Sequence, residues 1–334
     1  MRCGAPVVFV AVCMLGAGSS ACAKATITRF DVPGALDTFP YGINNAGSIA
    51  GSWLDSSGTA HGFVRSADGT FATFDVPGAG NAEATCIGDD GEVAGWYALS
   101  GENTRGFERS ADGTITTFKV GKVETFVSAI DRTGSVTGSY CDAIGQSGCT
   151  GIHGFVRSAK GTVTTFDPTG SVDTQPTGIN AAGTVAGTYS TSSQAHGFLR
   201  SSDGTITSFD PAGSTATFPN SLNDKGAITG SWRDQSNVRH GFLRAPDGTF
   251  TTIDPDGSAA TYAEAIDNAG AIAGSYYDSA GLEHGFLRTA AGKYDTFDPK
   301  RSLYTAPIAI NRGASVTGSW QGSGNYFHAF VRVP

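Results

Sequence analysis

The stretch HGFVRSADGTFATFD, residues 61–75, decides the fold because close copies of it recur along the chain. The copies are RGFERSADGTITTFK, HGFVRSAKGTVTTFD, HGFLRSSDGTITSFD, HGFLRAPDGTFTTID, HGFLRTAAGKYDTFD and a shortened HAFVRVP. Their first residues lie 43–48 positions apart, at His61, Arg105, His153, His196, His240, His284 and His328. Such units are fragments of one shared core, so the 334 residues need not form two domains.

A second motif, INNAGSIAGSW from residue 43, recurs with the same spacing. A period near 44 residues that contains several strand-like runs is typical of β-propeller blades. Helical repeats of similar length would show apolar residues at a 3.6-residue period, and the sequence lacks that pattern.

One unit is predicted to contain four short strands, at residues 39–44, 48–54, 61–65 and 70–76. The turns that join them are short and contain Asn, Asp, Ser and Gly, which is typical of a four-stranded antiparallel meander. Alternation along the strands puts apolar side chains on both faces, as in a sheet packed between two others. We expect Phe63 and Phe74 to share one of these faces.

The ends of the chain predict a closed ring. The last copy, HAFVRVP, has no fourth strand after it, whereas ATITRFDVPG from residue 25 matches a fourth strand with no other strands before it. An N-terminal strand that completes the C-terminal blade would remove the open edges of the sheet. The sequence therefore predicts an all-β, seven-bladed propeller with four-stranded blades over residues 24–334.

The N-terminal segment, residues 1–23, is predicted to be a signal peptide. Arg2 precedes a short apolar run, and Ala21-Cys22-Ala23 fits a cleavage site. The alternative is a lipoprotein acylated at Cys22. Either reading predicts an exported protein, periplasmic or secreted, and no later stretch is long and apolar enough to cross a membrane.

By its HGF[VL]R and HAFVR motifs the chain resembles the family of bacterial extracellular proteins with HAF repeats. The resemblance covers nearly all of the chain after the N-terminal segment. It implies an exported repeat protein and assigns no catalytic residues.

Composition limits the partners. The formal charge of −8, with one repeated arginine in each copy of the motif, gives no basic patch for nucleic acid. The sequence has no phosphate-binding glycine loop and no metal-ligand spacing, so we expect no cofactor and no metal site. We expect a monomer whose partner is a glycan or an extracellular or envelope protein.

The cysteines fit an oxidising compartment. Cys141 and Cys149 bracket a short loop in the longest unit, and we expect a disulfide between them. Cys86 is interpreted as a buried thiol rather than a nucleophile.

All six histidines occupy the first position of the repeat, and an aspartate recurs at its end. The copy in which His becomes Arg105 is also the copy in which Asp becomes Lys119. We therefore interpret the histidines as scaffold residues that contact these aspartates, rather than as catalytic or metal-binding groups.

One aromatic residue ends the second strand of each unit, and the predicted ring of aromatics would lie near one rim of the propeller. Such rings could stack on sugars, or they could pack between blades. These residues are Trp53, Tyr97, Tyr140, Tyr189, Trp232, Tyr276 and Trp320.

Positions that vary between units are better candidates for function than positions that the scaffold repeats. Tyr41, Glu83 and Glu264 lie in the strands expected nearest the axis, at the mouth of a central channel. Glu83 and Glu264 are candidate catalytic carboxylates for acid–base chemistry on a glycan, with solvated channel charge as the alternative.

Two functions remain open from the sequence. The first is a non-catalytic binding module for an envelope or extracellular glycan or protein. The second is a carbohydrate-active lyase or glycoside hydrolase whose site lies at the channel mouth.

Overall fold

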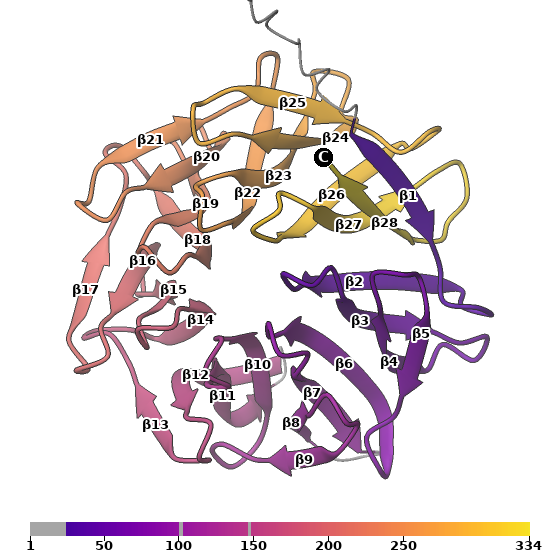
Figure 1. Cartoon of the computed structure of the whole chain (residues 1–334). Helices are drawn as coiled ribbons and strands as arrows, with labels where there is room; N and C mark the ends of the chain where they lie inside the picture. The colour runs from indigo at the N-terminus through magenta and orange to yellow at the C-terminus, as the bar shows by residue number, and fades with distance from the viewer. Residues whose placement is uncertain (1–24, 100–102, 146–147) are drawn as a thin grey trace, which may run out of the picture.

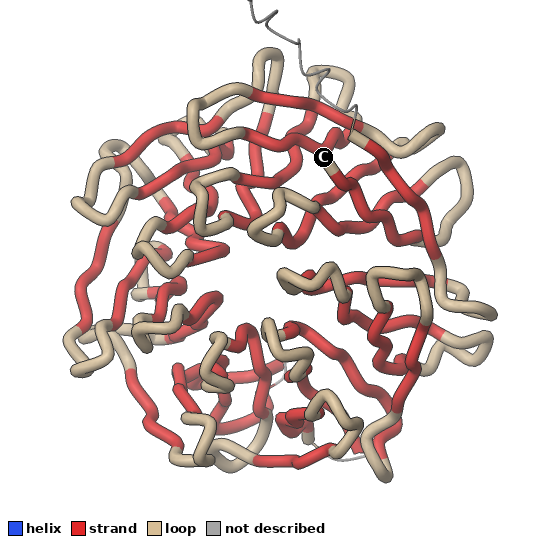
Figure 2. The backbone as a smooth tube through the Cα atoms, viewed as in Figure 1, coloured by secondary structure: helices blue, strands red, loops and turns tan. Residues whose placement is uncertain are grey.

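The computed structural model describes residues 25–99, 103–145 and 148–334. The predicted signal peptide, residues 1–23, and the alternative acylation site Cys22 lie outside the described residues. Within those ranges all regular secondary structure is β-strand (Figure 2). None of the described residues form a helix that is long and apolar enough to span a membrane.

The strands form four-stranded meanders that run outward from a common centre (Figure 1). The innermost strands are β2 (Asp37–Ile43), β6 (Ala79–Ile87), β10 (Thr125–Ile130), β14 (Asp173–Ile179), β18 (Ala216–Leu222), β22 (Ala260–Ile266) and β26 (Tyr304–Ile310). The second strands are β3 (Ile49–Leu54), β7 (Val93–Leu99), β11 (Val136–Gly145), β15 (Val185–Ser190), β19 (Ile228–Arg233), β23 (Ile272–Tyr277) and β27 (Val316–Gln321). We name each meander by its innermost strand.

The third strands carry the HGF motif. They are β4 (Ala60–Arg65), β8 (Thr104–Arg109), β12 (Gly148–Arg157), β16 (Ala195–Arg200), β20 (Arg239–Arg244), β24 (Glu283–Arg288) and β28 (His328–Val333). The outermost strands are β5 (Phe71–Phe74), β9 (Ile115–Phe118), β13 (Val163–Phe166), β17 (Ile206–Phe209), β21 (Phe250–Ile253), β25 (Tyr294–Phe297) and, beside β28, β1 (Thr26–Phe30).

Three meanders are separate four-stranded sheets, and the others are joined in pairs by a single parallel bridge. Strand β1 pairs antiparallel with β28, from Thr26↔Val333 to Phe30↔Ala329. The prediction of an all-β chain built of four-stranded sheets is confirmed, and the first unit matches its predicted strands to within two residues.

The HGF motif fits the core of each meander. Its phenylalanine is at most 1% exposed in every copy: Phe63, Phe107, Phe155, Phe198, Phe242, Phe286 and Phe330. The glycine before it makes room for an aromatic ring, because a Cβ on Gly62 would lie 2.4 Å from the ring of Phe74. Phe74 in turn meets Phe107 of the next meander edge-on, with ring centroids 5.9 Å apart.

The expectation that Phe63 and Phe74 share a face is wrong. Phe63 stands opposite Thr73 and Gly62 opposite Phe74, so the two rings lie on opposite faces. The hairpin turn explains the difference: Gly69 has φ +95° and adds a residue to the connection, which shifts the register. The sheet still has apolar side chains on both faces.

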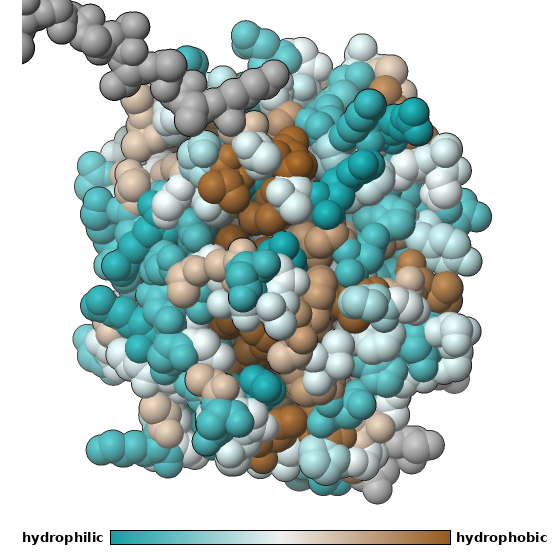
Figure 3. All heavy atoms as spheres, turned by 45° about the vertical axis from the view of Figure 1, so that its right-hand side comes forward, coloured by the Kyte–Doolittle hydropathy of each residue, from teal (hydrophilic) through white to brown (hydrophobic). Residues whose placement is uncertain are grey.

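The outside of the molecule is mainly polar. Figure 3 shows hydrophilic residues over most of one side, with hydrophobic residues in the recesses between them. The core therefore lies between successive meanders, and the innermost strands are left to line the centre.

Candidate functional site

Every histidine is paired with an aspartate, as the sequence predicted. The Nδ1 atom lies 2.6–2.9 Å from a carboxylate oxygen in His61–Asp75, His153–Asp167, His196–Asp210, His240–Asp254, His284–Asp298 and His328–Asp31. In two meanders the same aspartate also accepts a hydrogen bond from a buried threonine of the next inner strand, Thr174 or Thr217. The imidazoles thus fasten the third strand to the fourth and are occupied by the scaffold.

The predicted rim aromatics pack on these histidines. Ring centroids are 4.7–5.3 Å apart in the pairs formed by Trp53, Tyr140, Tyr189, Trp232, Tyr276 and Trp320 with the histidine opposite each. Tyr97 stands opposite Arg105 and is 3% exposed. One face of six of these rings is therefore covered by imidazole, which leaves less surface for a sugar. Their role in ligand binding stays a prediction.

A β-bulge in every inner strand aims one side chain at the centre. The register of the inner strand shifts at the position of Tyr41 in β2, and the same shift recurs in the six other inner strands. A bulge leaves one residue outside the ladder and redirects its side chain. Tyr41, Thr85, Asn220 and Glu264 accordingly line a central channel of about 310 Å³.

Several bulge residues connect one meander to the next. The hydroxyl of Thr85 donates to Val127 O at 2.9 Å, and that of Thr177 donates to Pro219 O at 2.9 Å. Asn220 Nδ2 donates to Glu264 Oε2 at 3.1 Å. The bulge position can therefore serve the scaffold or a ligand, depending on the residue that occupies it.

A second cavity, of about 410 Å³, lies between the β22 meander and the β26 meander. We name it the Glu264–Glu283 pocket. Its larger lining residues are Phe39, Tyr262, Glu264, Tyr277, Glu283, Tyr304 and Phe327. The volume is in the range of small-molecule sites. Glu264 and Ile308 line both this pocket and the central channel, so the two cavities are neighbours at these residues.

Glu264 has a pKa suited to proton exchange near neutrality. Burial and the nearby charge of Glu283 raise its pKa to about 7, against a smaller lowering by Arg239. Because burial disfavours the charged form, the carboxyl is partly protonated at neutral pH.

Glu283 is a functional candidate that the sequence reasoning missed. It is 7% exposed, its Oε1 accepts a hydrogen bond of 2.5 Å from Ser275, and burial raises its pKa. Tyr277 stands opposite it across the β23–β24 ladder and is near enough to influence that pKa, but it does not reach hydrogen-bond geometry with Oε2. The only signal in the sequence was that the residue before the repeated His differs in every unit except for two alanines.

Glu83 lies apart from this pocket. Among the described residues no hydrogen bond joins it to Glu264, and it does not line the Glu264–Glu283 pocket. Burial raises its pKa, and its charge adds to the effect of burial in raising the pKa of Tyr41 to about 12. The pairing of Glu83 with Glu264 as catalytic groups stays untested by this geometry, whereas Glu264 and Glu283 share one cavity.

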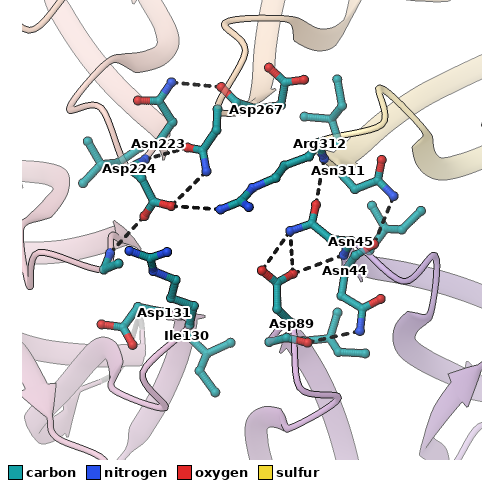
Figure 4. A pocket seen from close by; sticks show the side chains of 18 of the residues that line it. Asn44, Asn45, Asp89, Ile130, Asp131, Asn223, Asp224, Asp267, Asn311 and Arg312 are labelled. Carbon is teal, nitrogen blue, oxygen red and sulfur yellow. Dashed lines mark hydrogen bonds and ion pairs between the residues drawn. The ribbon is translucent and has the colours of Figure 1, made fainter.

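At the other end of the channel, polar contacts join the inner turns around a pocket of about 180 Å³ (Figure 4). Arg312 extends across it toward Asp224, with 3.6 Å between Nη2 and Oδ2. Asn45 Nδ2 donates to Asp89 at 2.7 Å, and Asn311 Nδ2 donates to Asn44 O at 3.0 Å. These side chains satisfy one another, so this mouth serves to join the inner turns.

The expected disulfide between Cys141 and Cys149 is present and ties β11 to β12. Burial raises the pKa of the Cys86 thiol to about 12, so it is a poor nucleophile. The described residues contain no group of three or more His, Cys, Asp or Glu side chains that could hold a metal ion.

Solved structures with this arrangement are β-propellers. Virginiamycin B lyase from Staphylococcus aureus matches with a TM-score of 0.62 at 11% identity, over 93% of this chain and 100% of that chain. The β-propeller domain of the Trilobed protease from Pyrococcus furiosus matches with a TM-score of 0.63 at 9% identity, over 88% and 95% of the two chains. No protein-family model and no curated protein sequence matches this chain. At such low identity the likeness establishes the fold alone.

Proposed function

We propose that this chain is an exported, seven-bladed β-propeller that acts as a non-catalytic binding module, with the Glu264–Glu283 pocket as its ligand site. The ligand would be part of an extracellular or envelope molecule. The disulfide between Cys141 and Cys149 supports export, because such bonds persist in oxidising compartments.

Contacts between the two ends of the chain support seven blades in a closed ring. Strand β1 supplies the outermost strand beside β28, and Asp31 pairs with His328 at 2.9 Å. Thr38 N of the first inner strand also donates to Phe327 O at 3.0 Å. Seven inner strands, each with its own HGF strand, then use every copy of the motif.

The observation that carries the binding function is the lining of the Glu264–Glu283 pocket. Three of its aromatic residues, Tyr277, Tyr304 and Phe327, stand at positions where no other meander carries an aromatic residue. In contrast, the repeated His, Asp and Trp or Tyr residues already hold one another. A pocket with an apolar wall and a few polar groups is the usual form of a ligand site.

The test is a glycan array that is combined with detection of new reducing ends. We expect the protein to bind a ligand without cleaving it, and the Phe39→Ala variant to bind at least about tenfold more weakly. Phe126→Ala is the matched control, because Phe126 occupies the same inner-strand position in a meander outside the pocket. Equal binding by Phe39→Ala and Phe126→Ala would place the ligand elsewhere.

The second candidate is a carbohydrate-active lyase or glycoside hydrolase. It is favoured by Glu264, with its pKa raised to about 7 by burial and by Glu283, because an acid and a carboxylate in one cavity can exchange a proton with a substrate. New reducing ends that appear with the wild type and disappear in Glu264→Gln would favour the enzyme over the binding module.

A further inference from the structure

We propose that the Glu264–Glu283 pocket binds a small organic ammonium ion, quaternary or N-methylated, between its aromatic rings and its two glutamates. This inference rests on the proposed binding function and names its ligand class. It is carried by the aromatic lining, by an unpartnered buried carboxylate oxygen, and by a cation that already lies on one of the same rings.

The aromatic rings form two groups inside the pocket. Tyr262 and Tyr277 have centroids 6.0 Å apart with planes at 65°, and Phe327 lies 5.5 Å from Tyr304 and 5.6 Å from Phe39. Rings tilted in this way present faces and edges in several directions around the cavity. The negative face of an aromatic ring attracts a cation without any hydrogen-bond donor, which is how aromatic cages hold quaternary ammonium groups.

The pocket contains two carboxyl groups that no cation of its lining pairs. Glu264 and Glu283 both line it, and no lysine or arginine is among its lining residues. Among the described residues, neither Glu283 Oε2 nor the hydroxyl of Ser319 has a hydrogen-bond partner, and both residues are more than nine-tenths buried. A buried carboxylate without a partner is costly, so a cation in the cavity would remove an existing penalty.

The neighbouring Arg239 shows that one of these rings already attracts a cation. Its guanidinium carbon lies 4.9 Å from the centroid of Tyr262 and 4.7 Å from that of Phe218. Arg239 itself is not among the residues that line the pocket.

A bare metal ion fits this lining less well than an organic cation. Hard metal ions need about six oxygen ligands, and the described residues contain no group of three ligating side chains. An ammonium group that carries methyl substituents is weakly hydrated and gains from contact with aromatic carbon. The combination of rings and carboxylates therefore favours the organic cation.

The test compares choline with 3,3-dimethylbutan-1-ol, its uncharged isostere of the same shape, by calorimetric titration of the full chain. We expect choline to bind at least about tenfold more tightly than the isostere. Glu283→Gln should weaken choline binding by about tenfold and leave binding of the isostere unchanged. Glu92→Gln is the control, since it removes a partly buried carboxylate that lies outside the pocket.

A second variant keeps the test valid if Glu283→Gln folds poorly. Tyr304→Leu keeps an apolar side chain but removes an aromatic face, so it should weaken choline binding more than binding of the isostere. Choline should also bind up to about tenfold more tightly at pH 8 than at pH 6, because Glu264 loses its proton in this range. Asn220, Arg239, Glu283 and Tyr304 are the groups that face Glu264 from neighbouring strands.

The proposal of an ammonium ligand is overturned if choline and the isostere bind equally well. It is also overturned if neither Glu283→Gln nor Tyr304→Leu changes the binding of choline. If a glycan then binds and Phe39→Ala abolishes its binding, the binding function stands without this ligand class. If choline, the isostere and every glycan fail to bind, both proposals fall. Binding of phosphatidylcholine vesicles together with free choline assigns the ammonium group to a lipid headgroup, and binding of choline alone assigns it to a soluble molecule; both results support the inference.

Discussion

Each histidine of the protein lies between an aromatic ring and one or two carboxylates. His284, for example, packs on Tyr276, pairs with Asp298 at 2.7 Å through Nδ1, and has Asp278 3.4 Å from Nε2. Partial burial alone would lower the pKa of His284, but its hydrogen bonds to the two aspartates and their charges outweigh burial and raise it above 6.5. The same balance raises the pKa of His61 and His153.

The raised pKa makes stability depend on pH. A group whose pKa is higher in the folded state stabilises the fold fully below its unfolded pKa, near 6.5, and loses this contribution as the pH rises through the folded value. We expect the free energy of unfolding to fall as the pH rises above about 6.5. Asp298→Asn should lower stability by about 1 kcal/mol at pH 6 and by less at pH 8.

Urea unfolding at the two pH values measures this difference. Asp256→Asn is the control, because Asp256 is exposed in the loop after β21 and forms no hydrogen bond with a histidine. A stability loss for Asp298→Asn that is the same at both pH values would contradict a charged His284.

At the residue scale, sequence reasoning found the scaffold groups and one of the two glutamates of the pocket. The joint replacement of His and Asp by Arg105 and Lys119 indicated that these residues touch, and the structure confirms the contact in the other copies. Glu264 was identified because its position varies. Glu283 was missed because it precedes a scaffold histidine, and its closeness to the pocket depends on how β24 meets β26.

At the scale of the strand, the bulge and a glycine depend on each other. In each second strand a glycine faces the bulge, and a Cβ there would lie 1.9–2.3 Å from a carbonyl oxygen of the inner strand: Gly51, Gly95, Gly138, Gly187, Gly230, Gly274 and Gly318. These glycines allow the two backbones to approach closely, which holds the bulge residue toward the centre.

Replacing one such glycine should therefore disturb both stability and ligand binding. In Gly274→Ala the new Cβ would lie 2.1 Å from Tyr262 O and 2.9 Å from the ring of Phe286. We expect a loss of about 3 kcal/mol in the free energy of unfolding, together with weaker binding in the pocket that contains Glu264. Chemical denaturation and ligand titration measure the two effects.

Gly324→Ala is the control for this variant, since nothing lies within 4 Å of a Cβ at that position. The result that contradicts the explanation is a Gly274→Ala protein as stable as Gly324→Ala.

The strand positions were predictable from apolar alternation and turn residues, but the bulge was not. A shift of one residue in register changes which side chain faces inward without changing the residues themselves.

At the scale of the whole molecule, the proposed ring closure depends on β1. Ile27 packs beside Phe330, and Phe30 packs in the same cluster as Phe63 of the first meander. A chain that begins at residue 32 would lose these contacts and leave β28 as an open edge. We expect it to unfold with a free energy lower by more than about 3 kcal/mol, and to self-associate through the exposed strand.

The matched control begins at residue 25 and keeps β1. Thermal unfolding and gel filtration of the two proteins measure stability and association. If both proteins melt at the same temperature and elute alike, the first strand does not hold the ring together.

The offset of the repeats predicted the pairing of β1 with β28 from the sequence, because only the first and last segments lacked partners. The cavity between the β22 and β26 meanders was not predictable, since it depends on the space between two meanders rather than on either one.

The bulges allow the side chain at one position of each inner strand to vary while the backbone keeps its geometry. Each inner strand directs one side chain into the central cavity. The backbone at that position is held by the close approach of a glycine of the second strand to a carbonyl of the inner strand, and this contact does not involve the side chain. A substitution at such a position changes one side chain of the channel wall and leaves this backbone contact in place. Tyr41, Thr85 and Glu264 show that an aromatic ring, a hydroxyl and a carboxyl group can all occupy this position of the fold.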